Sequence, residues 1–210
     1  MARLAELANT LTHGIGLALS VAGLVVLVLM AVAKGHLIHI VSCSVYGSSL
    51  VVLYLASTLY HSMKTPRVKQ VFRILDHSAI FVLIAGSYTP FLLVNMRGAW
   101  GWSLFGVVWG LALIGIVIKI FFIQRLPALS VLLYVAMGWL VIVAIKPLLA
   151  SLPPAGILLL VAGGISYTGG LVFYAWQRLP YHHAYWHLAV MGGSLCHYLA
   201  VVFFVIPRGA

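Results

Sequence analysis

Acidic residues are almost absent from this chain. Glu6 and Asp76 are the only two among 210 residues, and all charged residues together make up 7% of the sequence. A soluble domain carries roughly 25% charged residues, whereas 64% of this chain is hydrophobic. So little polar surface excludes a separate water-soluble domain, and lipid is the expected solvent for most of the protein.

Cysteine is also scarce. Cys43 and Cys196 are the only two cysteines; they form no CxxC pair, and both lie within apolar runs. This pattern excludes a thiolate metal cluster and is typical of small apolar packing residues.

Basic residues outnumber acidic ones by 12 to 2, which gives a formal net charge of +10. In a soluble protein this excess would indicate a nucleic-acid partner. Here the basic residues stand singly or in small groups between apolar runs, where the positive-inside rule and anionic lipid head groups account for them. We therefore expect membrane lipids as partners and no nucleic acid.

The apolar runs are long enough to cross a membrane, which takes about 20 residues of helix. Short breaks separate the runs, so neighbouring helices must be antiparallel, and lipid-exposed irregular backbone is excluded. The chain is predicted to be an all-α membrane protein, a single seven-helix transmembrane domain over residues 1–210 with a short amphipathic segment at 1–13. The predicted spans are Gly14–Ala33, Leu37–Met63, Ile74–Asn95, Gly101–Phe122, Ala128–Lys146, Ala155–Gln177 and Ala184–Ile206.

The distribution of Lys and Arg predicts the orientation of the bundle. The amino-terminal side collects eight basic residues, which are Arg3, Lys64, Arg67, Lys69, Arg73, Lys119, Arg125 and Arg178. The other side has four, which are Lys34, Arg97, Lys146 and Arg208. The excess places the amino terminus in the cytoplasm and the carboxy terminus outside. The segment Lys64–Arg73 dominates the count.

Glycines cluster in the sixth predicted span, as Gly163-Gly164 and Gly169-Gly170. Close approach of neighbouring helices in lipid explains such a cluster; a hinge is the alternative.

Four segments bring their polar residues to the same, cytoplasmic membrane face. Residues four apart lie on one helix face, one turn from each other, and the i, i+3, i+7 spacing forms a stripe in the same way. The residues are Glu6, Asn9 and His13 before the first span, Ser57 and His61 on the second, Asp76 on the third, and His183 and His187 on the seventh.

Each of these groups alone is ambiguous. A single His near a helix end is usually an interfacial residue, and an isolated HxxxH occurs often by chance. Their convergence, together with both acidic residues of the chain, favours a functional site because a carboxylate within the membrane is costly and needs a partner.

The chemistry of the converging residues fits zinc. His183 and His187 can bind one ion through two imidazoles, and His61 would supply a third nitrogen. Three protein ligands with one open position is the pattern of catalytic zinc. Asp76 would then accept a proton from water or orient it, and Ser57 would hydrogen-bond water or a substrate oxygen. A three-histidine set suits zinc best, with iron and manganese as alternatives.

The remaining histidines are not predicted as ligands. His182 points about 100° away from His183 on an ideal helix. His197 is off the ligand stripe and is expected to be a buried, hydrogen-bonded residue, with a role in a cavity as the alternative. His36 and His39 lie at the opposite membrane face. The aromatic residues at the span ends are explained by the aromatic belt.

Three motifs together resemble the hemolysin III family of bacterial membrane proteins. They are Ser57-Thr-Leu-Tyr-His61, Leu75-Asp76-His-Ser78, and His183-Ala-Tyr-Trp-His187 with His197 ten residues later. That family is related to the progestin and adipoQ receptors and, more distantly, to the alkaline ceramidases. The segments from Glu6 to His13 and Gly86-Ser-Tyr-Thr-Pro90 are similar to its bacterial branch.

The resemblance implies seven spans, a cytoplasmic amino terminus, a place in the bacterial plasma (inner) membrane and a zinc site. It puts the metal ligands at His61, His183 and His187, and contacts with water or substrate at Ser57 and Asp76.

Several functions remain open at this point. The first is a metal-dependent intramembrane hydrolase of the ceramidase type, which acts on lipid amides or esters and affects membrane homeostasis. The second is a non-enzymatic sensor or regulator of membrane state with structural zinc. A pore-forming cytolysin fits less well, because the polar residues stop about two turns into one leaflet. A signalling receptor fits less well still, since no soluble ligand-binding or effector-binding domain is predicted.

Overall fold

The computed structural model describes residues 2–34, 36–122 and 127–207, and within them it contains helices and no strand. Seven helical segments are long and apolar enough to cross a membrane, which confirms the predicted fold class. Six crossings are single helices apart from one π-helical turn, η1 (Phe91–Asn95), that extends α3. They are α1 (Ala2–Lys34), α2 (Leu37–Ser62), α3 (Pro66–Pro90), α4 (Ala99–Phe122), α7 (Pro154–Ala175) and α8 (His182–Phe204).

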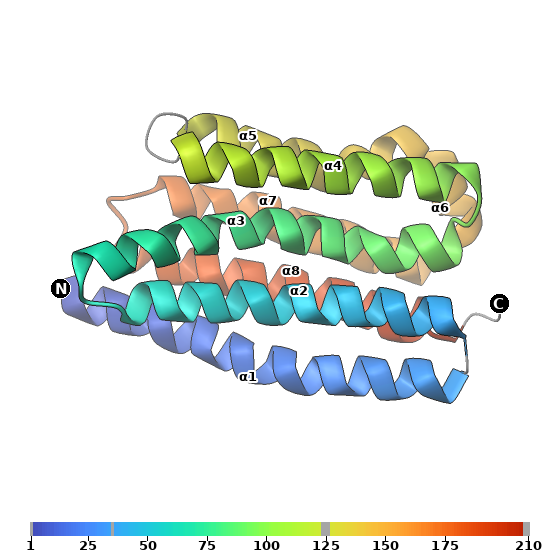
Figure 1. The fold of residues 1–210 in the computed structure, drawn as a ribbon, viewed down its shortest axis with the longest axis horizontal. Helices are drawn as coiled ribbons and strands as arrows, with labels where there is room; N and C mark the ends of the chain where they lie inside the picture. Colours follow the sequence, from blue (N-terminus) through green and yellow to red (C-terminus); the bar gives the residue numbers. More distant parts are fainter. Residues whose placement is uncertain (1, 35, 123–126, 208–210) are drawn as a thin grey trace.

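The helices form an antiparallel bundle (Figure 1). α1 packs against α2 and α8, α2 packs against α3, α3 packs against α4, and α7 packs against α8. The start of α1, the turn between α2 and α3, and the link between α7 and α8 all lie at one end of the bundle. Segments far apart in the sequence therefore meet at this end.

Two predicted boundaries differ from the structure near that end. α1 begins at Ala2 and runs without a break through residues 2–13 of the predicted amphipathic segment into the first span. α3 begins at Pro66, so most of the predicted break Lys64–Arg73 is helical and the link consists of residues 63–65. Proline is favoured in the first helical turn because its fixed φ suits a helix and its missing N–H has no intrahelical partner there.

The fifth crossing is not one regular helix. It consists of α5 (Pro127–Gly138), a 3₁₀ turn η2 (Leu140–Ala144) and α6 (Ile145–Ser151), which ends five residues beyond the predicted Lys146. The Tyr88 hydroxyl on α3 lies 2.9 Å from the carbonyl oxygens of Met137 and Gly138, and it accepts the Val141 N–H at 3.0 Å. One side chain thus satisfies backbone groups that the break would otherwise leave unpaired in lipid.

Apolar residues cover both the inside and the outside of the bundle. Leu19, Leu29 and Phe121 each expose more than 60% of their surface, which lipid tolerates without cost. α3 and α2 are the most buried crossings, and the fully buried Tyr46 and Phe81 lie on them. The core is therefore built around α2 and α3, next to the end of the bundle where the polar residues meet.

The glycines of α7 allow α8 to approach closely, as predicted. A Cβ added at Gly170 would lie 2.6 Å from the Cβ of Ala189, and one at Gly163 would clash with His197 Cδ2. A Cβ added at Gly169 would meet nothing within 4 Å. Only some of the clustered glycines therefore serve helix packing.

The orientation of the bundle remains a prediction. Two residues of the basic count, Arg125 and Arg208, lie outside the described residues.

Candidate metal centre

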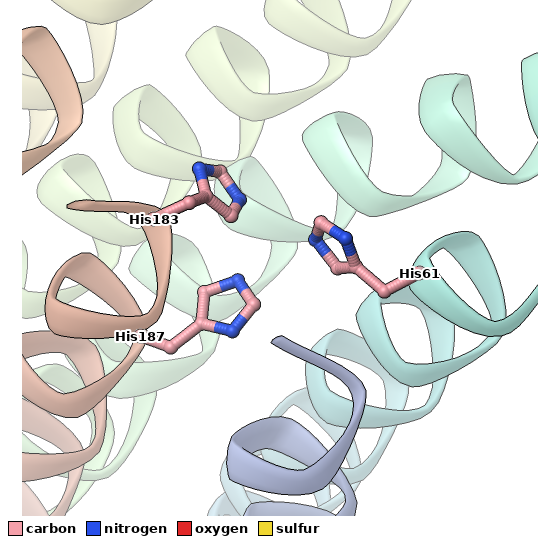
Figure 2. Close-up of side chains that lie close together, drawn as sticks. All are labelled: His61, His183 and His187. Carbon is pink, nitrogen blue, oxygen red and sulfur yellow. The ribbon is translucent and has the colours of Figure 1, made fainter. Parts of the chain in front are cut away.

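Three histidines from two helices meet near the end of the bundle. Figure 2 shows His61 from α2 facing His183 and His187 from α8. The ring centroids are 5.0 Å apart for His61 and His183, 5.1 Å for His61 and His187, and 4.7 Å for His183 and His187. One nitrogen from each ring lies within 4.8 Å of the other two, and this is a group that could hold a metal ion. We call these three residues the histidine triad.

His61 keeps one ring nitrogen free. Its Nδ1 lies 2.7 Å from Oε2 of Glu6, so the proton sits on Nδ1 and is donated to the carboxylate. Its Nε2 is buried and has no hydrogen-bond partner. A buried polar atom normally has a partner, so this orphaned lone pair fits a metal ligand.

His187 is held in a similar way. It is 2% exposed, and its Nδ1 lies 3.0 Å from the Thr12 hydroxyl on α1. His13 of the same helix stacks on the His187 ring, with centroids 3.5 Å apart and planes 13° apart. Both ring nitrogens of His13 are buried without a partner. The predicted stripe of Glu6, Asn9 and His13 therefore does reach the triad.

A cavity of about 190 Å³ opens beside the triad. His183, His187, Ser57 and Asp76 line it, whereas His61 does not. The structure thus brings both predicted catalytic residues to the same space as two of the predicted ligands. Ser57 and Asp76 are 1% and 8% exposed. The Ser57 hydroxyl adjoins the Asp76 carboxyl, although no hydrogen bond of good geometry engages its Oγ.

Three further charged or titratable residues of this cavity were not predicted from the sequence as part of the site. Arg73, His77 and Lys119 line it together with Asp76, and Lys119 is only 3% exposed. His77 Nδ1 donates to the Arg73 carbonyl oxygen at 2.8 Å. From the sequence, Arg73 and Lys119 were used only in the count of basic residues that predicts the orientation of the bundle. Arg73 is one helical turn before Asp76 on α3, whereas the proximity of Lys119 to Asp76 depends on the packing of α4 against α3.

The histidines that were not predicted as ligands have other contacts. His182 Nδ1 lies 3.1 Å from the carbonyl oxygen of Phe173 on α7. His197 Nε2 lies 3.3 Å from the carbonyl oxygen of Leu160, and the residue also lines the cavity. The hydrogen bond expected for His197 is therefore present, and so is the contact with the cavity that was its alternative.

The donor set fits a borderline transition metal. Imidazole nitrogens suit zinc, copper, iron and nickel, while magnesium and calcium prefer oxygen ligands. Three nitrogens without a fourth protein ligand also match the open coordination of catalytic zinc. Among the described residues, this is the one group of three or more His, Cys, Asp or Glu with such spacing.

Comparison with known proteins agrees with the resemblance seen in the motifs. Residues 1–198 match the protein-family model for haemolysin-III related proteins. The chain is 51% identical over 205 residues to Hemolysin-3 of Bacillus cereus, covering 98% of this chain and 94% of that protein. It is 50% identical over 201 residues to the Hemolysin-3 homolog of Bacillus subtilis (strain 168), covering 96% and 94%.

A more distant relative is found in animals. The human monocyte to macrophage differentiation factor is 26% identical over 163 residues, which cover 75% of this chain and 67% of that protein. Because the family match extends over nearly the whole chain, this multi-pass membrane protein belongs to the hemolysin III family.

Proposed function

We propose that the protein is a zinc-dependent intramembrane hydrolase that acts on lipid amides or esters in the bacterial plasma membrane. One observation supports this proposal most. A single cavity carries two histidines of the triad, the Asp76 carboxyl and the Ser57 hydroxyl on its wall. The rest of that wall is largely apolar, with Leu83, Ile84, Val135, Leu171 and Val190 among its residues.

The residues divide into ligands and groups that act on the substrate. His61, His183 and His187 would hold the ion, which when bound supplies a Lewis acid that polarises a carbonyl and acidifies water. Asp76 would accept the proton of the attacking water at a carboxylate oxygen and pass it to the leaving group. Ser57 would donate its hydroxyl proton to the substrate carbonyl oxygen, since its Oγ adjoins the Asp76 carboxyl without a hydrogen bond of good geometry.

The apolar walls favour a lipid substrate. An acyl chain would lie against the aliphatic side chains of α3, α5 and α7, where it excludes water from the reacting carbonyl. With the amino terminus in the cytoplasm, the triad would lie in the cytoplasmic leaflet, where lipids reach it from within the membrane.

The decisive variant is Asp76→Asn, because it preserves the shape of the side chain and removes the base. In purified protein reconstituted in lipid nanodiscs, we expect Asp76→Asn to keep its zinc and to lose about 10²- to 10⁴-fold in turnover of lipid amides or esters. His187→Ala should lose both zinc and turnover. Ser78→Ala is the matched control, since Ser78 is a buried serine of the same helix that does not line this cavity.

Mass spectrometry of the nanodisc lipids would detect the fatty-acid product. No product from the wild-type protein with zinc bound, across both amide and ester lipids, would contradict the hydrolase.

A non-enzymatic regulator with structural zinc is the second candidate, and the origin of the ligands favours it. His61 comes from α2 and the other two histidines come from α8, so one ion would hold together two helices that are far apart in the sequence. This candidate predicts that chelation lowers thermal stability while lipid products never appear. Both candidates predict the loss of stability, since an ion that binds only the folded state stabilises it; the product distinguishes them.

A further inference from the structure

The first turns of α1 contact two residues of the histidine triad, His61 and His187. α1 packs against both α2 and α8, the two helices that carry the triad. Glu6 and Thr12 are six residues apart, which is about 240° around an ideal helix. Glu6 therefore reaches His61 on α2, while Thr12 reaches His187 on α8.

Glu6 determines which ring nitrogen of His61 carries the proton. Its carboxylate accepts the Nδ1 proton through Oε2 at 2.7 Å, and its second oxygen, Oε1, accepts from Lys69 Nζ at 2.6 Å. The Asn9 amide nitrogen is farther from the same Nδ1, at 3.4 Å. The shorter contact is also the charge-assisted one, and such hydrogen bonds are about twice as strong as neutral ones.

Thr12 influences which ring nitrogen of His187 carries the proton, because its hydroxyl has only one proton to donate. The hydroxyl has one proton, and the carbonyl oxygens of Ala8 and Asn9 lie 2.9 and 3.0 Å from Oγ1. With the proton donated to the backbone, as is common for Thr in a helix, the oxygen is left as an acceptor. In that arrangement His187 donates its Nδ1 proton to Thr12 across 3.0 Å, beside a backbone hydrogen bond between the His187 ring and Asn9, and Nε2 is left as the free lone pair.

We propose that Glu6 and Thr12 are positioning residues of the metal centre: from one helix they fix both His61 and His187 as the Nδ1–H tautomer and direct both Nε2 atoms to the metal. This inference rests on the proposed metal centre and assigns a task to α1, which contributes no ligand to the triad. Metal-bound histidines commonly donate their second N–H to a carboxylate or another oxygen, and loss of such a partner costs about 10- to 100-fold in metal affinity.

Two isosteric variants test the inference. Glu6→Gln removes the charge but not the shape of the side chain, and Thr12→Val removes the hydroxyl but not the shape. Thr10→Val is the matched control, because Thr10 makes the same kind of bond to the backbone of α1, to Glu6 O at 2.9 Å, without contacting a triad residue. Thr12→Ser restores the hydroxyl and serves as the rescue.

The measurement is zinc affinity of purified full-length protein in detergent, by competition with a chromophoric chelator, together with the absorption spectrum of the Co²⁺-loaded protein. Thermal unfolding of the metal-free variants reports on folding separately. We expect about 10- to 100-fold weaker zinc binding for Glu6→Gln and for Thr12→Val, with a changed Co²⁺ spectrum. Thr10→Val and Thr12→Ser should remain close to the wild type.

The outcomes separate the inference from the function on which it rests. If the wild type binds zinc and both variants bind it equally well with the same Co²⁺ spectrum, the positioning role is overturned and the metal centre stands. If the affinity falls only in proportion to the stability of the metal-free protein, and equally in Thr10→Val, α1 acts by packing alone and the inference is overturned. If the wild type binds no zinc, both the inference and the proposed metal centre fail.

Discussion

Tyr181 has an uncommon backbone conformation directly before the helix that carries two residues of the triad. Its φ is 57°, and among the described residues it is the one non-glycine residue with a positive φ. A side chain in this left-handed region costs about 1–2 kcal/mol because Cβ crowds the following carbonyl oxygen. Residues with such strain cluster at functional sites, and Tyr181 lies two residues before His183.

We predict that Tyr181→Gly is more stable than Tyr181→Ala by about 1 kcal/mol, because glycine adopts this conformation without a Cβ. The alanine variant is the proper reference since it also lacks the ring but keeps Cβ. Thermal unfolding of both proteins in one detergent would measure the difference. Equal stability would mean that the backbone here is not strained.

Residue identities on one helix face were predictable, but the partners of those residues were not. His183 and His187 follow from a four-residue spacing, and His61 follows from its depth in the membrane. Nothing in the sequence indicated that Thr12 contacts the triad, because a threonine in a helix usually forms a hydrogen bond only with the backbone of its own helix. Its contact with His187 depends on where α1 crosses α8, and the tautomer of a histidine depends on such contacts.

The helices α7 and α8 form one closely packed pair, in which Gly170 of α7 lies against Ala189 and Trp186 of α8. Of two neighbouring glycines in α7, Gly170 faces α8 and Gly169 faces open space. Gly170 thus supports the position of α8, which carries His183 and His187 of the triad.

We predict opposite effects for alanine at these two glycines. Gly170→Ala should destabilise the fold by about 1–3 kcal/mol, because the new Cβ overpacks the interface at 2.6 Å from Ala189 Cβ. Gly169→Ala should be neutral or stabilise the helix by up to about 1 kcal/mol. Both changes alter helix propensity equally, so the difference in unfolding temperature reports the contact with α8. Equal effects would contradict the packing role.

At the scale of elements, the number of crossings was predictable and their internal breaks were not. Length and hydropathy determine how many helices cross a membrane. The break between Gly138 and Ile145 is possible because Tyr88, from a helix distant in sequence, pairs with its backbone groups. The sequence of the fifth span alone does not indicate that Tyr88 is the partner of these groups.

At the scale of the whole molecule, the histidine triad and both acidic residues, Glu6 and Asp76, lie toward one end of the bundle. The link at residues 63–65 and the link from α7 to α8 lie at the end of the triad, and the link between η1 and α4 lies at the other end (Figure 1). The distribution of basic residues predicts that the end with the triad faces the cytoplasm.

Single cysteines at opposite ends of the bundle would test this orientation. Thr65 and Ala99 are both exposed, and each can be replaced by cysteine, with the native cysteines changed to alanine. In intact cells, a membrane-impermeant maleimide should label Ala99→Cys, and it should label Thr65→Cys only after permeabilisation. The reverse pattern would place the triad at the outer leaflet and contradict the predicted orientation.

The most direct test of the metal centre is the metal content of the purified protein and its histidine variants. Mass spectrometry of metals should find about one zinc ion per wild-type chain, as three converging imidazoles require, and a loss of most of it in His61→Ala, His183→Ala and His187→Ala. His182→Ala should keep its zinc, because that neighbouring side chain bonds to α7 instead. Equal metal content in all five proteins, or none in the wild type, would contradict a metal centre at the histidine triad.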